Sequence, residues 1–126
     1  MKPLIIQVTV GAAEGGEKLA QLLIESGLAV CVQRISNIQS TYQWQGKICH
    51  DTETLLLIKS SEEKWEEIQK VILENHPYEC PEIVAISPLE VEKNYLSWWN
   101  DSINRSKNET EDISAMKIVS TPFQSH

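Results

Sequence analysis

The hydrophobic positions in the first part of the chain follow two different periods. Over residues 4–10, apolar residues alternate with Gln7 and Thr9, which is the pattern of a strand with one buried face. Over residues 17–26, leucines recur at helical spacing, and Gly27 follows at the position where a left-handed helix cap forms most easily. The pattern therefore predicts a strand followed by a helix.

Residues 28–60 lack helical periodicity and predict one long hairpin, with a tight turn at Gln45-Gly46-Lys47. Each arm has about 15 residues, or roughly 50 Å at about 3.3 Å per residue, whereas strands usually have about 3 to 10 residues. A body of this size has a radius of gyration of about 14 Å, so the hairpin must bend, curl or project from it. A projecting arm leaves unpaired edges that another chain can complete, which favours oligomerisation. In the alternative interpretation, a bulge near Ser36-Asn37 divides each arm into shorter strands.

The second half of the chain predicts three further elements. Residues 60–63 (SSEE) have the spacing of a capping box, and the apolar stripe that follows predicts a helix that ends near Asn75. Residues 83–86 predict a buried strand, and residues 95–99 predict a short third helix. The order of elements indicates an α+β domain, the split βαβ arrangement of the ferredoxin-like fold with an added C-terminal helix. We expect this domain to cover residues 1–103 and residues 104–126 to form a mobile polar extension.

Charge and composition narrow the classes of partner. The chain has 126 residues and a net charge of −7, and the segment before residue 104 carries 15 acidic against 8 basic residues. Such a surface repels phosphate backbones, so nucleic acid is not an expected partner. No apolar run is long enough to span a membrane, and we expect no membrane association. Cys31, Cys49 and Cys80 form no CxxC pair, which favours reduced thiols and a cytoplasmic location.

The segment NHPYECPEI at 75–83 is the first candidate for chemistry. Imidazole and thiolate are ligands for copper, and His76 and Cys80 lie four residues apart. However, Pro77 and Pro81 make the segment extended, where the two side chains need not meet. The alternative is a purely structural corner in which Pro77 ends a helix and Tyr78 packs its ring against the body.

Other candidates have weaker patterns. Cys31 lies in the apolar context AVCV at 29–32, which favours a buried structural cysteine. Glu53, Lys59 and Glu82 could form ion pairs across strands or subunits, whereas Tyr42 and Trp44 share one face of the hairpin and favour packing at an interface. The sequence contains no GxSxG, GxGxxG, GxxxxGK[ST] or HExxH motif, so we do not expect an enzyme.

Five motifs, in order along the chain, carry a resemblance to a known family. They are AVCV at 29–32, YQWQGKI at 42–48, LIKS at 57–60, HPYECPEI at 76–83 and YLSW at 95–98. Together they resemble the CutA divalent-cation-tolerance family over roughly residues 4–103. The resemblance implies a ferredoxin-like subunit in a tight homotrimer, with long hairpins that pair across subunits, and a link to copper tolerance. In overall architecture the family also resembles the trimeric PII signalling proteins.

The resemblance also indicates which residues could hold a metal. In the relatives for which copper binding is proposed, the ligands are a cysteine on the first strand and two histidines directly before Pro-Tyr. Here Val8 stands at the position of the cysteine and Asn75 at that of the first histidine, so only His76 matches. The resemblance therefore implies a weak site for copper or another divalent cation at His76, to which Cys31, a carboxylate or a symmetry-related subunit could contribute.

Three hypotheses about function follow. The first is a metal-responsive homotrimer that binds copper or another divalent cation weakly through His76. The second is a PII-like sensor in which clefts between subunits bind a small anion or metabolite; the candidate lining residues are Tyr42, Trp44, Glu53, Lys59, His76, Tyr78 and Glu82. The third is a non-enzymatic scaffold trimer that presents its surface or its tail to a protein partner.

Overall fold

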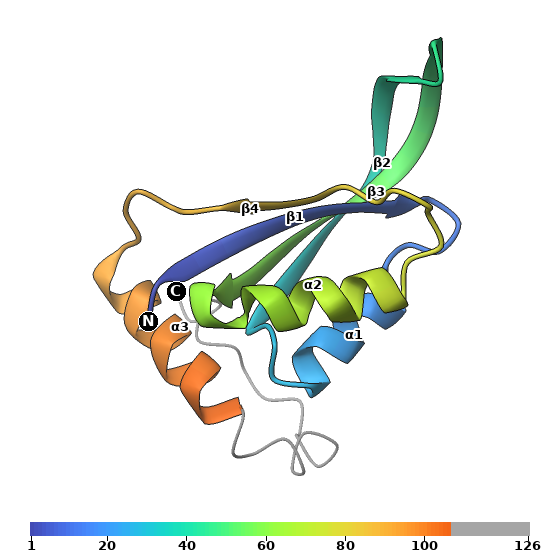
Figure 1. Ribbon diagram of the computed structural model, residues 1–126. Coiled ribbons are helices and arrows are strands. Elements are labelled where there is room, and N and C mark those ends of the chain that lie inside the picture. The colour runs from blue at the N-terminus through green and yellow to red at the C-terminus, as the bar shows by residue number, and fades with distance from the viewer. Residues whose placement is uncertain (107–126) are drawn as a thin grey trace.

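Four antiparallel strands form one sheet in the computed structural model, which describes residues 1–106 (Figure 1). The strands are β1 (Pro3–Gly11), β2 (Cys31–Trp44), β3 (Lys47–Ser61) and β4 (Ile83–Ile86), and their order in the sheet is β2-β3-β1-β4. The helices are α1 (Glu17–Glu25), α2 (Trp65–Glu74) and α3 (Lys93–Ser106), and a 3₁₀ turn (Glu62–Lys64) precedes α2. The α+β class and the predicted order of elements are confirmed.

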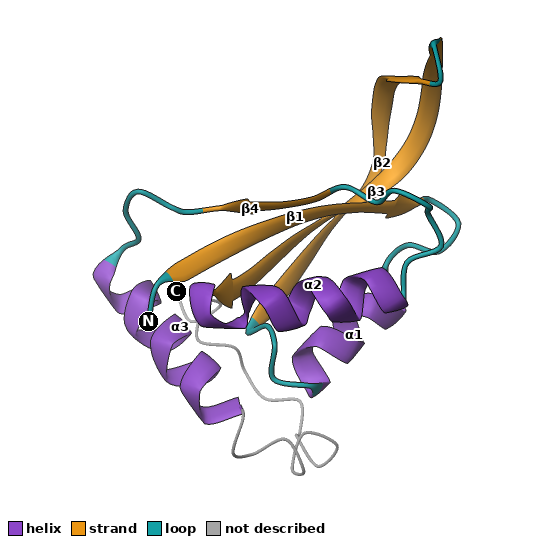
Figure 2. Ribbon diagram, viewed as in Figure 1, coloured by secondary structure: helices purple, strands orange, loops and turns teal. Residues whose placement is uncertain are grey.

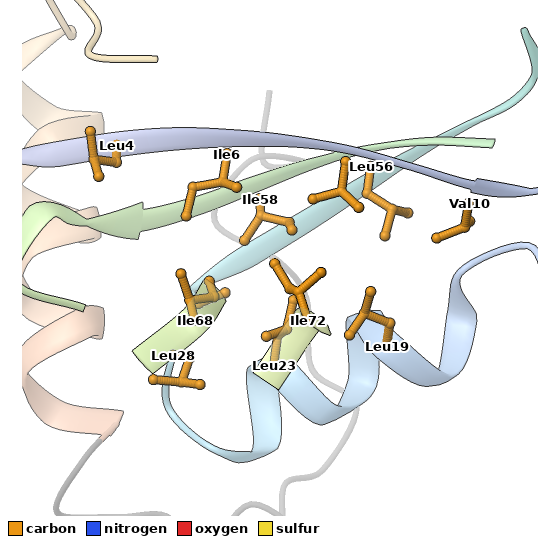
Figure 3. Packing of buried hydrophobic residues seen from close by; sticks show 12 residues of the cluster. Leu4, Ile6, Val10, Leu19, Leu23, Leu28, Leu56, Ile58, Ile68 and Ile72 are labelled. Carbon is orange, nitrogen blue, oxygen red and sulfur yellow. The ribbon is translucent and has the colours of Figure 1, made fainter. Parts of the chain in front are cut away.

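The hydrophobic core lies between α1, α2 and one face of the sheet (Figures 2 and 3). The alternation expected for β1 sends every second residue toward the helices, and the leucines and isoleucines of α1 and α2 at helical spacing meet them. The side chains with no exposed surface at this contact are Ile6, Val8, Leu23, Leu56, Ile58, Ile68 and Ile72. Within residues 1–106, no helix has the length and hydrophobicity needed to cross a bilayer.

The hairpin formed by β2 and β3 projects beyond the body, which is one of the three outcomes that the length of its arms allows (Figure 1). Gln45 and Gly46 form its tight turn with φ of 50° and 77°, the left-handed geometry that matches the twist of a hairpin. Both arms are continuous strands, but the register shifts between Ile35 and Ile38, where Asn37 has φ 61°. The bulge therefore occurs where the alternative interpretation places it, although it does not divide the arms.

The start of α2 and the length of α3 differ from the predictions. The hydroxyl of Ser60 does not cap a helix, because this buried residue still belongs to β3 and donates to the Leu28 carbonyl at 2.6 Å. The predicted short third helix is instead 14 residues long, since Trp99 and Ile103 are buried and the indole of Trp99 donates to the Ser60 carbonyl at 2.9 Å. The folded part thus continues past residue 103 to Ser106, and the rest of the predicted extension lies outside the described residues.

The opposite face of the sheet, which we call the open face, carries a group of apolar side chains among polar ones and is not covered by α1 or α2 (Figure 2). Its side chains come from all four strands, as the register shows. They include the half-buried Ile5, Leu55 and Leu57 and the more exposed Ile35, Val84 and Ile86. The prediction that residues 83–86 are buried is wrong for the single subunit, because β4 is an edge strand with half of its side chains on the open face.

Candidate functional site

A cleft of about 800 Å³ lies where the corner after α2 meets the projecting arm of the hairpin. β3 contributes Asp51 and Glu53 to the cleft, and the corner contributes Tyr78 and Glu82. The full set of lining residues is Thr9, Ser40, Thr41, Tyr42, Trp44, Asp51, Thr52, Glu53, Tyr78, Glu79, Cys80 and Glu82.

Two tyrosine hydroxyls hold two of the carboxylates in place. The Tyr78 hydroxyl donates to Glu53 Oε2 at 3.2 Å, and the Tyr42 hydroxyl donates to Asp51 Oδ2. Burial and the nearby charge of Glu53 raise the pKa of Tyr78 to about 12. The hydrogen bond to Asp51, with a smaller contribution from burial, raises the pKa of Tyr42 to about 12. Both hydroxyls therefore stay protonated at neutral pH and remain donors to the carboxylates.

The cleft carries negative charge without a neutralising cation in the part of the chain that the structure describes. Asp51, Glu53, Glu79 and Glu82 line it, and none of these four acids makes an ion pair within residues 1–106. Glu82 accepts a neutral hydrogen bond from the Gln7 amide at 3.1 Å. Because the charge is negative, the cleft of this subunit does not favour a small anion, which was one of the two ligand classes in the second hypothesis.

His76 lies beside the cleft and uses both ring nitrogens within the fold. The backbone N–H of Tyr78 donates to His76 Nδ1 at 3.1 Å, so Nε2 carries the proton and donates to the Thr9 carbonyl at 2.7 Å. Within residues 1–106, no group of three or more His, Cys, Asp or Glu side chains is arranged to hold a metal ion. Metal binding by His76 stays a prediction, and a metal would first have to displace one of these backbone contacts.

Lys59 and Cys31 lie outside the cleft. They are paired across β2 and β3, and the ammonium of Lys59 donates to the Tyr95 hydroxyl at 2.7 Å. The same ammonium lies 4.9 Å from the centre of the Tyr95 ring. Lys59 therefore contacts α3 at the base of the hairpin, and Cys31 is half-buried next to it.

The cleft brings together five of the predicted lining residues and some that the sequence analysis missed. Tyr42, Trp44, Glu53, Tyr78 and Glu82 all line it. The missed residues include Asp51, which could have been found from its spacing, because it lies two residues before Glu53 and therefore on the same face of β3. Cys80 is exposed and also lines the cleft.

Comparison with known proteins places this fold in a family. A family model described as CutA1 divalent ion tolerance protein matches residues 4–102. This chain belongs to the CutA1 family. The resemblance carried by the five sequence motifs is thereby confirmed.

Individual relatives agree with this assignment. The chain is 34% identical over 98 residues to the divalent-cation tolerance protein CutA of Thermus thermophilus, a match that covers 78% of this chain and 95% of that protein. It is 35% identical over 99 residues to the chloroplastic protein CutA of Arabidopsis thaliana, which covers 79% of this chain but only 54% of the longer plant protein. The crystal structure of CutA1 from Oryza sativa superposes with a TM-score of 0.76 at 34% identity, covering 81% of this chain and 94% of that structure.

Proposed function

We propose that this chain acts in divalent-cation tolerance as a non-enzymatic homotrimer of ferredoxin-like subunits. The observation that carries the role in tolerance is the family match, which spans nearly all of the described residues. The strand order β2-β3-β1-β4 supports a ferredoxin-like subunit. Free thiols at Cys31, Cys49 and Cys80 support a reducing compartment such as the cytoplasm.

The open face and the projecting hairpin support the trimer. Exposed apolar side chains gathered on one face of a small domain favour an interaction site, and the uncovered side chains of Ile35, Val84 and Ile86 are 43–47% exposed. Packing this face against other copies buries those side chains, and each Å² of apolar surface removed from water stabilises the assembly by about 25 cal/mol. The unpaired edges of β2 and β4 can extend the sheet across subunits.

Sedimentation velocity tests the assembly. The variant Leu57→Lys places a charge in the middle of the open face, and we expect the trimer to dissociate. The control is Leu73→Lys, since Leu73 is 56% exposed on α2 and lies away from the open face. A wild-type monomer, or an intact trimer in Leu57→Lys, would contradict the proposed interface.

The metal contact that we propose is weak and uses His76. Coordination at either ring nitrogen displaces a backbone hydrogen bond, and leaving such a group without a partner costs about 1–3 kcal/mol, or roughly ten- to hundredfold in affinity. Calorimetric titration with Cu(II) and Zn(II) should therefore show weak, saturable binding that His76→Ala abolishes. Cys31→Ser tests the weaker candidate. Heats that are the same in wild type and His76→Ala would sink the assignment of His76.

The cleft supports a second candidate function, a PII-like trimer that senses a small molecule. Its volume and the five predicted residues gathered on its walls favour a bound ligand. Its position at the border of the open face would place it between subunits of the trimer. This function predicts thermal stabilisation by a small molecule in the presence of a chelator, which the metal hypothesis does not. A scaffold role that depends on the tail concerns residues outside the described part of the chain and stays a prediction.

A further inference from the structure

We propose that the cleft binds a linear organic polycation, with one ammonium group on Asp51 and another on Glu53. This inference rests on the second candidate function, because it names the ligand class of the same cleft. It is independent of metal binding at His76.

Glu53 is the least exposed of the four carboxylates that line the cleft. It is only 7% exposed, and removing a carboxylate from water is costly unless a charge or several hydrogen bonds compensate. Within residues 1–106, it accepts one hydrogen bond, from a neutral hydroxyl to Oε2, and makes no ion pair. Its other oxygen, Oε1, has no hydrogen-bond donor in the described part of the chain, keeps accessible surface and belongs to a residue that lines the cleft, so a cation in the cleft can reach it. A cation in the cleft would supply the missing partner.

The spacing of the carboxylates favours an extended cation over a single metal ion. Asp51 and Glu53 are two residues apart on the same face of β3, which places their Cα atoms about 6.6 Å apart at about 3.3 Å per residue. Metal ions need ligand atoms at about 2–2.6 Å, and the described residues contain no group of three acidic, histidine or cysteine side chains that could supply them. The two ammonium groups of a four-carbon diamine span this separation when the chain is extended.

The tyrosines orient both carboxylates toward such a ligand. Each carboxylate has one oxygen occupied by a tyrosine hydroxyl, Asp51 by Tyr42 and Glu53 by Tyr78. The second oxygen of each carboxylate has no donor within residues 1–106 and is available for a charge-assisted hydrogen bond from an ammonium group. The cleft thus contains two separated acceptors that the fold already holds in place.

The aromatic side chains suit the rest of the ligand. Tyr42 and Trp44 line the cleft and are 41% and 44% exposed, so their rings present apolar surface to a bound molecule. Ring faces attract organic cations and also cover methylene groups. A polyamine combines the two properties, because its charged groups are separated by short hydrocarbon segments. An anion finds no positive side chain among the lining residues.

Isothermal titration with 1,4-diaminobutane and with spermidine, in chelator and at constant ionic strength, tests the proposal. We expect saturable binding to the wild type, tighter for spermidine because Glu79 and Glu82 can take its third ammonium group. Glu53→Gln and Asp51→Asn should each weaken binding about tenfold. Glu67→Gln changes the net charge by the same amount on the exposed surface of α2 and should leave binding unchanged.

A variant that keeps the charge of the cleft tests the proposal even if Glu53→Gln and Asp51→Asn fail to fold. Trp44→Leu should weaken binding roughly threefold or more through the lost ring face. Sedimentation of every sample shows whether the assembly is intact, so a failed trimer is distinguished from a failed ligand site. Equal weakening in Glu67→Gln, or the absence of saturable heat in an intact wild-type assembly, would overturn the proposal.

Discussion

The hydrogen bond from the Tyr78 hydroxyl to Glu53 should contribute measurably to the free energy of unfolding. Tyr78→Phe removes this hydroxyl and leaves the ring in place. Hydrogen bonds to charged groups contribute about 1.5–3 kcal/mol, and the 3.2 Å distance with partial solvent access places this one at or below the lower end. We therefore expect Tyr78→Phe to lower the free energy of unfolding by about 1 kcal/mol.

Urea denaturation at neutral pH and fixed protein concentration measures this loss. The matched control is Tyr42→Phe, which removes the same kind of bond to the exposed Asp51 and should not change stability measurably. In a double-mutant cycle, the cost of Tyr78→Phe should vanish in a Glu53→Met background, where the acceptor is absent. A cost that persists there, or an equal cost for Tyr42→Phe, would refute the assignment of the loss to this bond.

Three further predictions follow from the fold. Because the raised pKa of Tyr78 favours its neutral form, the associated stability is present below about pH 10 and is lost as the pH rises toward 12; urea midpoints of wild type should fall in this interval more than those of Tyr78→Phe. Gly46→Ala should lower the free energy of unfolding by about 1 kcal/mol, because Gly46 has φ 77°, where an alanine backbone is strained, while the added Cβ would touch no other atom. Thermal denaturation measures this loss, and an unchanged melting temperature would contradict the turn geometry. Trp99→Phe should lower the free energy of unfolding, measured in urea, by about 2 kcal/mol, since it leaves the buried Ser60 carbonyl without the indole donor. A loss of less than a few tenths of a kcal/mol would show that water replaces the indole as the donor.

Local signals predicted most of the fold. The two-residue period of β1, the glycine of the hairpin turn and the helical stripe of α2 depend on neighbours in sequence, and the structure confirms each of them. The capping box failed because Ser60 is still part of a buried strand, a fact that depends on packing against Leu28, 32 residues earlier. The last turns of α3 failed for a similar reason. Their polar sequence has little pattern, and it is the burial of Ile103 that continues the helix.

The candidate site was predictable only in part. The shared face of Tyr42 and Trp44 follows from strand alternation, and the family resemblance pointed to the corner at Tyr78. The contacts of His76 were not predictable, because its partner is the carbonyl of Thr9, 67 positions away, and a backbone acceptor leaves no signal in side-chain chemistry. The sign of the charge in the cleft also needed the fold, which brings acids of β3 and of the corner to the same walls while it keeps Lys59 elsewhere.

The bulge at Asn37 determines which side of the hairpin each later residue of β2 faces. Between Ile35 and Ile38, β2 uses three residue steps where β3 uses two, from Leu55 to Glu53. Odd-numbered residues of β2 point to the open face before this step, and even-numbered residues do so after it. Because the bulge absorbs the extra residue, Tyr42 and Trp44 keep Cys49 and Lys47 as partners and stay on the open face. A regular ladder with the same number of residues would shift the register by one position and turn both rings to the opposite side of the hairpin. The bulge thus decides whether these aromatic rings line the cleft, and a change that abolished the bulge while keeping the number of residues would move both rings away from its wall.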